Sequence, residues 1–303
     1  MKKTISLIIT ILLIISVAFL VIKKTNQPNE NLKLQVSTSF YPMYFFASLI
    51  GRDKVNVVNI TPAGAEPHDY DPTPQDIIKI QNSKLLILNG SVETWANKIK
   101  TNLNEKSTQI LVAGENLENQ KIEENGAMTT DPHVWLSPHL AKIESQKIEK
   151  KLEDINPVNS DYYKSNLMKL EMDLDQIDQN YKIGLQNCQL KSFITSHAAF
   201  GYLSKDYGLT QIAIDGLSPD AEPSLKELAQ IADFTKKNNI KIIFFEALVS
   251  PKLSQTIADE AGAKTLVLDP IEGISDKDLS KDTTYLTLMT NNLQNLRTAL
   301  QCK

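Results

Sequence analysis

Short apolar segments alternate with longer amphipathic segments along most of the chain, and this alternation predicts its fold class. Segments of four to six residues that are mainly apolar, or that alternate apolar with polar residues, have the length of strands. They are separated by stretches in which apolar residues recur every three or four positions. Strands alternating with helices are typical of a parallel sheet covered by helices, so the predicted class is α/β. We expect strands at residues 34–39, 55–60, 84–88, 109–112, 192–195, 211–214, 241–245 and 265–268, and a polar loop at residues 114–130. We expect helices at residues 41–50, 92–103, 138–154, 161–186, 198–207, 223–238, 251–261 and 283–300, and another that begins at Pro74 behind the N-cap residue Thr73.

The predicted helix at residues 161–186 is unusually long. It contains neither glycine nor proline before Gly184, and at about 1.5 Å per residue it would extend for roughly 40 Å. Its apolar residues form a single stripe, made of Tyr163, Leu167, Leu170, Leu174, Ile177 and Tyr181.

Strands and helices alternate on both sides of this long helix. We therefore expect two lobes, each a parallel sheet flanked by helices, joined by one long rigid backbone helix. The predicted divisions are residues 1–31 for a signal or membrane anchor with its linker, 32–158 for the N-terminal lobe, 159–187 for the connecting helix and 188–303 for the C-terminal lobe.

The first residues of the chain differ from the rest. Lys2 and Lys3 precede an apolar run over residues 5–22, and Lys23 and Lys24 begin a polar stretch, a pattern typical of a secretion signal. The run is about long enough to cross a bilayer and has no clear small-x-small cleavage site, so we expect an uncleaved membrane anchor, with a cleaved signal as the alternative. No cysteine follows it that would carry a lipid. The remainder is expected to be extracytoplasmic, either periplasmic or on the cell surface.

The part of the chain after this segment is acidic. Residues 1–24 hold four lysines and no acidic residue, so without them the formal net charge changes from −4 to −8. An acidic body of this kind argues against nucleic-acid binding. Cys188 and Cys302 would lie in a compartment where disulfides persist, and either a disulfide or two free thiols fits the sequence.

Three of the four histidines lie beyond the carboxyl ends of predicted strands. His68 follows the second strand, His133 lies beyond the fourth strand, and His197 ends the first strand of the second half. Asp269 ends the fourth strand of that half. Open parallel sheets bind ligands at this edge, so His68, His133, His197 and Asp269 are predicted to hold one divalent metal ion, with two ligands from each lobe.

Three imidazoles and one carboxylate favour Zn²⁺ over Ca²⁺ or Mg²⁺, which prefer oxygen ligands. Four protein ligands would fill a tetrahedral shell, whereas a catalytic zinc keeps one position open for water. Glu66 and Glu246 stay open as alternatives to Asp269, or as hydrogen-bond partners of a ligand imidazole. The fourth histidine, His139, begins a predicted helix and is expected on the surface.

Several motifs in order along the chain resemble the zinc/manganese-type solute-binding proteins of bacterial ABC transporters. They are the Pro-His-Asp-Tyr loop around His68, residues 131–136 around His133, residues 196–203 around His197, and residues 268–273 around Asp269. The resemblance extends from about residue 34 to the C-terminus. It implies two lobes joined by a backbone helix, with the metal held between them by the residues that match as His68, His133, His197 and Asp269.

The resemblance also indicates which metal is bound. Manganese-selective members carry glutamate where this chain has His197, so histidine points to the zinc-uptake branch, with manganese or iron as the alternative. Many zinc members carry a long histidine-rich loop before the second ligand motif, whereas residues 114–130 contain no histidine. Ser137 replaces an aspartate common in the family, which exchanges one helix cap for another.

The predicted function is an extracytoplasmic receptor, not an enzyme. It would act as a monomer that captures a divalent metal ion, expected to be Zn²⁺, and delivers it to an ABC-type permease driven by a cytoplasmic ATPase. The alternatives are a zinc-dependent hydrolase with an open coordination position, a manganese or iron receptor, and a surface protein with a structural metal. A hydrolase is disfavoured because Asp269 would fill the shell and no HExxH motif is present.

Overall fold

Two four-stranded parallel sheets form the framework of the protein. The structure is a computed structural model that describes residues 33–104, 106–124, 127–218, 224–275 and 283–303. The first sheet has the order β2-β1-β3-β4 and the second the order β10-β9-β7-β8. Their strands are β1 (Leu34–Thr38), β2 (Val55–Asn59), β3 (Leu85–Leu88), β4 (Gln109–Val112), β7 (Ser192–Thr195), β8 (Thr210–Ala213), β9 (Ile242–Phe245) and β10 (Lys264–Val267). The predicted α/β class with two helix-flanked parallel sheets is confirmed.

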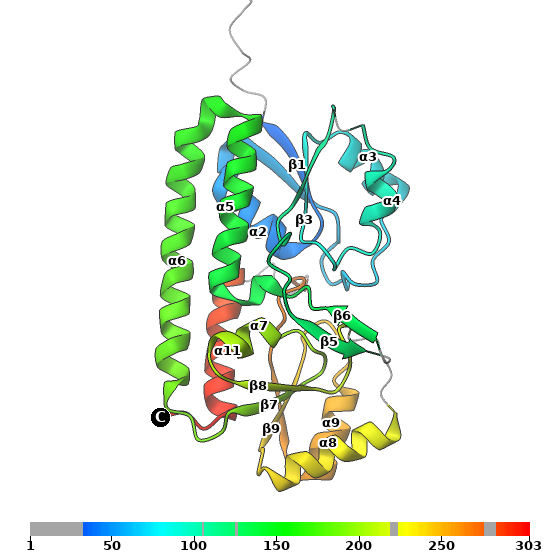
Figure 1. Cartoon of the computed structure of the whole chain (residues 1–303), viewed down its shortest axis with the longest axis vertical. Helices are drawn as coiled ribbons and strands as arrows, with labels where there is room; N and C mark the ends of the chain where they lie inside the picture. The colour runs from blue at the N-terminus through cyan, green and yellow to red at the C-terminus, as the bar shows by residue number, and fades with distance from the viewer. Residues whose placement is uncertain (1–32, 105, 125–126, 219–223, 276–282) are drawn as a thin grey trace, which may run out of the picture. The chain divides into compact units, whose positions relative to one another are not determined.

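Helices flank both sheets, and one of them is much longer than the rest (Figure 1). The long helix α6 (Ser160–Gln186) packs against α5 and α2, which belong with the first sheet, and against α11, which belongs with the second. The other helices are α2 (Tyr41–Gly51), α3 (Pro74–Gln81), α4 (Ala96–Lys100), α5 (Pro138–Ile155), α7 (Gly201–Asp206), α8 (Leu225–Lys237), α9 (Lys252–Ala261) and α11 (Tyr285–Ala299). The two sheets belong to one compact unit, Leu34–Lys303, so the division into lobes at residues 158 and 187 stays a prediction.

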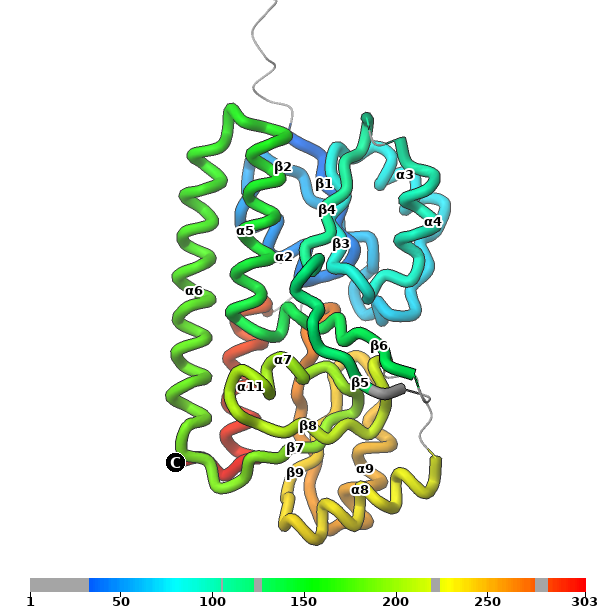
Figure 2. The backbone as a smooth tube through the Cα atoms, viewed as in Figure 1, coloured from blue at the N-terminus to red at the C-terminus, as the bar shows by residue number. Residues whose placement is uncertain are grey.

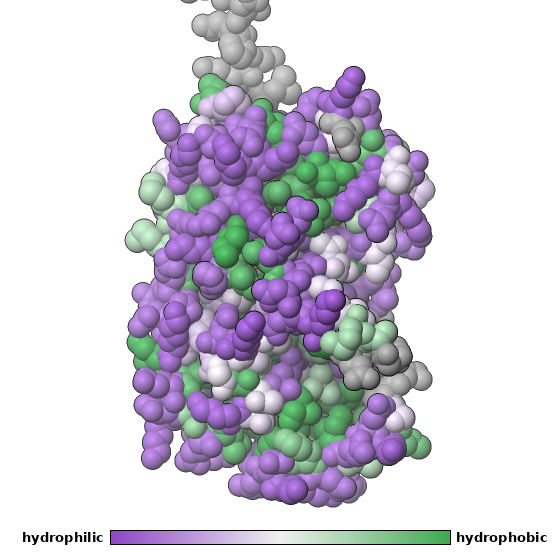
Figure 3. Space-filling view, in the orientation of Figure 1, coloured by the Kyte–Doolittle hydropathy of each residue, from purple (hydrophilic) through white to green (hydrophobic). Residues whose placement is uncertain are grey.

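The apolar stripe predicted on α6 forms part of the main core. All six of its predicted residues are buried, and Leu185 extends the stripe by one turn. Met168 and Met172 lie on the opposite side of the helix and are 57% and 71% exposed. Hydrophilic side chains cover most of the face shown in Figure 3, with smaller apolar areas between them.

Helix starts follow the capping signals in the sequence. The Thr73 side chain caps α3 by accepting a hydrogen bond from the amide of Asp76, and the Asp76 carboxylate accepts one from the Thr73 amide. The Ser137 side chain caps α5 by accepting a hydrogen bond from the amide of Leu140, and Pro138 stands at the first helical position. Such caps stabilise a helix by about 1 kcal/mol each, because they satisfy amides that have no partner within the helix.

Two predictions about local structure were wrong. The helix expected at residues 92–103 is limited to α4, because the carboxylate of Glu93 binds the amides of Asn89 and Gly90 and holds the preceding residues in turns. The segment expected to be a polar loop contains the antiparallel hairpin β5 (Lys121–Glu124) and β6 (Ala127–Thr130) (Figures 1 and 2). Its strands show little apolar alternation, so hydrophobicity does not reveal them.

The predicted membrane anchor lies outside the described residues. Within the residues that the structure does describe, no helix is both long enough and apolar enough to span a membrane.

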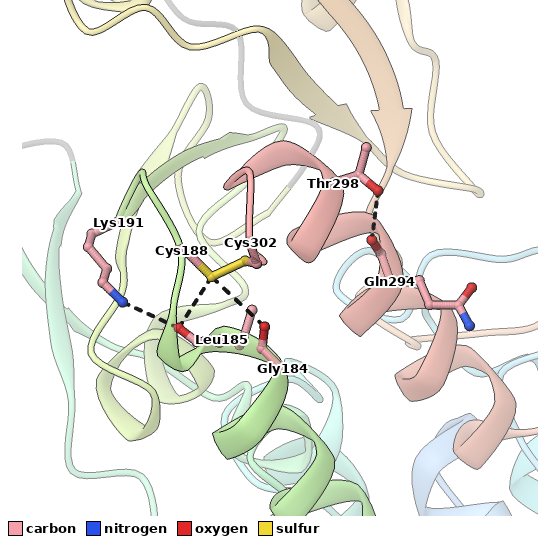
Figure 4. The surroundings of a disulfide bond; sticks show 7 residues. All are labelled: Gly184, Leu185, Cys188, Lys191, Gln294, Thr298 and Cys302. Carbon is pink, nitrogen blue, oxygen red and sulfur yellow. Dashed lines mark hydrogen bonds between the residues drawn. A yellow bond between two sulfur atoms is a disulfide. The ribbon is translucent and has the colours of Figure 1, made fainter.

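A disulfide joins Cys188 to Cys302 and ties the end of the chain to the end of α6 (Figure 4). Backbone hydrogen bonds support this junction, since Leu190 donates to Leu300 and Lys303 donates to Asn187. Of the two states that the sequence left open, the structure has the disulfide.

We predict that removing this disulfide destabilises the protein without changing its ligand site. The bond spans a sequence separation of 114 residues. Replacing both cysteines by serine should lower the free energy of unfolding by about 2–4 kcal/mol, because the unfolded chain regains the freedom of a long closed loop. Urea denaturation of the oxidised protein, the reduced protein and the double variant would measure this. The reduced protein should match the variant, and equal stability of all three would contradict the prediction.

Candidate metal centre

Three imidazoles and one carboxylate meet at the carboxyl ends of strands from both sheets. Their ligand atoms, one from each of His68, His133, His197 and Glu272, all lie within 4.8 Å of one another. His68 comes from the segment between β2 and α3, and His133 follows the β5–β6 hairpin. His197 lies two residues after the end of β7, and Glu272 lies in the segment after β10. The structure therefore brings together the three predicted histidines. With Glu272, two of the four ligand segments come from each half of the chain.

The spacing of these atoms matches a tetrahedral site. His68 Nε2 and His197 Nε2 lie 3.3 and 3.4 Å from His133 Nε2. Glu272 Oε1 lies 3.2 Å from the Nε2 atoms of His68 and His133 and 3.4 Å from that of His197. Zinc–nitrogen and zinc–oxygen bonds of about 2.0–2.1 Å in a tetrahedron place ligand atoms about 3.3 Å apart. The four atoms are thus spaced to surround one zinc-sized cation.

The site is almost completely shielded from solvent. The side chains of His133 and His197 are 0% exposed, that of Glu272 is 1% exposed, and that of His68 is 9% exposed. A low-polarity environment strengthens the attraction between a cation and its ligands, but it also makes an uncompensated charge unfavourable.

Buried carboxylates orient two of the three imidazoles. Asp131 Oδ1 lies 2.8 Å from His133 Nδ1 and also accepts the backbone amide of His133 at 3.0 Å. Glu246 Oε1 lies 2.7 Å from His197 Nδ1 and accepts the amide of His197 at 3.2 Å. A proton held on Nδ1 by a carboxylate leaves Nε2 with a free lone pair, so both rings present the atom that binds a metal. Glu246 thus takes the hydrogen-bonding role that the sequence left open for it.

His68 is held differently. Its backbone amide donates to Glu66 Oε1 at 3.3 Å, and its Nε2 contacts His133 and Glu272. Among the described residues, no hydrogen-bond partner contacts its Nδ1 atom. His68 is therefore the least constrained of the three imidazoles.

The buried charges shift one another's pKa values. Burial alone would lower the pKa of His133, but hydrogen bonds to Asp131 and Glu272 raise it above the ordinary value. Burial likewise opposes charge on His197, yet Glu246 and Glu272 hold its pKa well above that value. Burial alone would raise the pKa of Glu272, but His197 and the hydrogen bonds from the imidazoles hold it well below its usual range. Without a cation, protons on the imidazoles thus balance the carboxylates.

Glu66 adds a further, half-buried acid beside the site. Burial and the neighbouring Glu272 raise the pKa of Glu66 to about 9, so its carboxyl is protonated near neutral pH. Glu66 does not supply any of the four ligand atoms that lie within 4.8 Å of one another.

Asp269, the expected carboxylate ligand, is not part of the group, and Glu272 is found there instead. Asp269 Oδ1 accepts the amide of Ile271 at 2.7 Å, and the Asn292 side chain binds both the amide and the carbonyl of Asp269. These hydrogen bonds hold Asp269 in the turn that follows β10. Ile271 has a positive φ of 59°, and the chain then places Glu272 at the site. Glu272 lies within the motif that carried the family resemblance, which is the signal that could have identified it.

The segment around His133 is also bonded to the second half of the chain. Trp135 Nε1 donates to the carbonyl of Pro270 at 2.8 Å, and the hydroxyl of Tyr285 donates to the carbonyl of Trp135. The hydroxyl of Tyr202 donates to the carbonyl of Asp131 at 2.9 Å. These hydrogen bonds within the chain hold the segment around His133 against the second half of the chain.

Comparison with known proteins agrees with this site. The family described as zinc-uptake complex component A, periplasmic (ZnuA) matches residues 36–299. The chain is 38% identical over 283 residues to the high-affinity zinc uptake system protein ZnuA of Bacillus subtilis (strain 168), with 89% of each chain covered. It is 37% identical over 301 residues to the zinc-binding lipoprotein AdcA of Streptococcus pneumoniae (strain R6), covering 95% of this chain and 60% of that relative.

A solved structure shows the same fold. The crystal structure of the Zn(II)-bound ZnuA-like domain of Streptococcus pneumoniae AdcA matches with a TM-score of 0.77 and 37% identity. The match covers 89% of this chain and 99% of that domain.

Two parallel sheets with a buried four-ligand site between their carboxyl edges define a metal-binding transport receptor. The chain belongs to the ZnuA family of zinc-uptake components, as the match over residues 36–299 shows. The predicted family, the zinc ligand and the non-enzymatic role are confirmed.

We predict that Glu246→Gln weakens zinc binding about 10- to 100-fold, because the amide is a poorer acceptor for His197 Nδ1–H. Competition with a zinc chelator would measure the affinity, and circular dichroism would check the fold. Asp69→Asn is a suitable control, since Asp69 is exposed and adjoins His68 in sequence. Equal affinities of the Glu246 variant and the control would show that the carboxylate does not orient the ligand.

Proposed function

We propose that His68, His133, His197 and Glu272 bind one Zn²⁺ as cargo, and that the protein delivers this ion to the permease of an ABC-type zinc-uptake system. The observation that carries this proposal is the set of ligand-atom spacings of 3.2–3.4 Å in a buried site. Relatives named for high-affinity zinc uptake and for zinc binding support it.

The ligand types favour zinc over manganese or iron. Three neutral imidazole nitrogens suit a borderline cation, whereas manganese favours oxygen-rich, six-coordinate sites. The fourth position belongs to Glu272, so a cation in this site has four protein ligands. An open position for a reactive water, which a hydrolase needs, is therefore not provided.

Release requires at least one ligand to withdraw. A backbone hydrogen bond from the Gly64 amide to the Ile274 carbonyl joins the segment that carries His68 to the second half of the chain. The His68 ring itself has no hydrogen-bond partner at Nδ1 among the described residues. The long helix α6 packs along both halves, which disfavours a wide hinge motion. We therefore propose that movement of the His68 segment opens the site.

The protein is proposed to act as a monomer outside the cytoplasmic membrane, held there by its N-terminal apolar segment. The periplasmic description of the family and the lipoprotein relative support the location. The ATPase that drives transport would be a separate cytoplasmic partner.

We predict that Glu272→Gln lowers zinc affinity at least about 100-fold, because an amide lacks the charge that balances the cation. Asp269→Asn should change zinc affinity less than about tenfold, since Asp269 acts through the turn. Competitive titration with Zn²⁺, Mn²⁺ and Fe²⁺ would compare both variants with the native protein. If Asp269→Asn abolishes binding and Glu272→Gln does not, Asp269 is the ligand; if Mn²⁺ displaces Zn²⁺, the proposed cargo is wrong.

We also predict that zinc binding releases protons and weakens as the pH falls. The pKa values of His133 and His197 lie above the ordinary histidine value of about 6.5, so both imidazoles are protonated below their raised pKa values, and zinc must displace these protons. Apparent affinity should therefore decrease as the pH is lowered through those values. Titration calorimetry in buffers of different ionisation enthalpy would count the released protons. An affinity that is constant from about pH 8 to pH 5 would contradict histidine ligation.

A further inference from the structure

Asp131, the carboxylate that orients His133, is bonded directly to the other half of the chain. The Asp131 amide donates to the carbonyl of Gln120 at 3.0 Å, and the hydroxyl of Tyr202 donates to the Asp131 carbonyl at 2.9 Å. Tyr202 lies in the first turn of α7, which begins one residue earlier at Gly201. The backbone of Asp131 is therefore held from both sides, and one of these bonds comes from the start of α7.

Gly201 approaches the Asp131 carboxylate too closely for any side chain to stand at this position. A Cβ atom at Gly201 would lie 2.6 Å from Asp131 Oδ2 and 3.5 Å from Gln120 Oε1. Non-bonded heavy atoms normally lie about 3.5–4.0 Å apart, so the first distance requires a neighbour to move. The backbone of Gly201 itself is ordinary, since the described glycines with positive φ are Gly64, Gly208 and Gly262. Glycine is therefore needed here for the close approach and not for the backbone conformation.

The Asp131 carboxylate cannot give way without disturbing His133. Its Oδ1 atom accepts both the amide and the Nδ1–H of His133, whereas its Oδ2 atom has no hydrogen-bond partner among the residues that the structure describes. The Asp131 side chain is only 1% exposed, so it has no solvent into which to turn. Because the two oxygens belong to one rigid group, a displacement of Oδ2 shifts Oδ1 and changes both bonds to His133.

We propose that Gly201 is a positioning residue for zinc binding. The absence of a side chain at Gly201 lets the Asp131 carboxylate keep the position from which it directs His133 Nε2 at the metal. Gly201 acts through Asp131 and not on the cation. The second half of the chain thereby helps to orient a ligand that belongs to the first half. This inference rests on the proposed zinc-binding function.

We predict that Gly201→Ala weakens zinc binding about tenfold or more, the loss expected when the partner of a ligand imidazole is disturbed. Helix propensity alone predicts no such loss, because alanine favours a helix more than glycine does. Gly184→Ala is the matched control, since Gly184 also lies in a helix and the atoms nearest to its Cβ would belong to the side chains of Arg297 and Leu293, at 3.2 Å or more. Competition with a zinc chelator would measure the affinities, and circular dichroism would check the fold.

A double variant tests whether the effect passes through Asp131. Asp131→Ala alone should weaken zinc binding about 10- to 100-fold, because His133 loses its acceptor. In this background the atom that the new Cβ would meet is absent, so adding Gly201→Ala should weaken binding by less than about twofold further. A further loss as large as that of Gly201→Ala in the native protein would overturn the proposal. If Gly201→Ala alone does not fold, the double variant should fold, and its failure to do so would also overturn the proposal.

Nuclear magnetic resonance separates this role from a general loosening of the site. In the zinc-loaded protein with ¹⁵N-labelled histidine, Gly201→Ala should shift or remove the Nδ1–H signal of His133 and leave that of His197 unchanged. Weaker binding with an unchanged His133 signal, or a change confined to His197, would overturn the proposal. Equal zinc affinities of the native protein and Gly201→Ala would refute this inference alone. Absence of zinc binding by the native protein would instead refute the proposed function.

Discussion

The metal site depends on two buried hydrogen bonds from imidazole to carboxylate, one in each half of the chain. Asp131 holds His133, and Glu246 holds His197, through Nδ1 and the backbone amide together. Without these bonds either ring could turn its protonated nitrogen towards the cation, and the site would lose a ligand. The pKa values of His133 and His197 are raised, which favours protonated imidazoles when no metal is bound. The cation then replaces protons, so the buried acids are compensated in both states, which limits the unfavourable free energy of burying them.

Hydrogen bonds within the protein position the segment that carries His133. His133 lies between Asp131, which receives a bond from Tyr202, and Trp135, which is bonded to Pro270 and Tyr285. These contacts cross between the two halves of the chain, and α6 packs along helices of both. Because these side chains are already held in place, metal binding loses little free energy to ordering the protein. In the proposed release step, movement of the His68 segment opens the shell.

Much of the fold could be predicted because its signals are local. The stripe of α6 recurs within single turns, and the caps at Thr73 and Ser137 lie within three residues of the amides they bind. The three histidines were found because strand ends determine which residues share an edge of the sheet. The fourth ligand depended on the path of the backbone after β10. There the chain is turned by the hydrogen bond that the Ile271 amide donates to Asp269 Oδ1, by the positive φ of Ile271 and by the contact of Asp269 with Asn292. The hydrophobic periodicity of the sequence gives no sign of these features. The hairpin at residues 121–130 was missed for a similar reason, since its backbone pairing leaves no apolar pattern.

The preference for zinc depends on two residues together, His197 and Glu246. The family resemblance links glutamate at position 197 with manganese, but in this chain position 197 faces Glu246 at hydrogen-bonding distance. A carboxylate in place of His197 would lose the Nδ1–H donor and bring two negative charges together in a buried site. Such charges repel strongly unless one is protonated or a further cation is bound. His197 thus supplies the Nδ1–H donor for the Glu246 carboxylate. Glu246 in turn orients the imidazole so that Nε2 faces the zinc site. A change of metal preference would need both positions to change, because either substitution alone leaves a buried group without its partner.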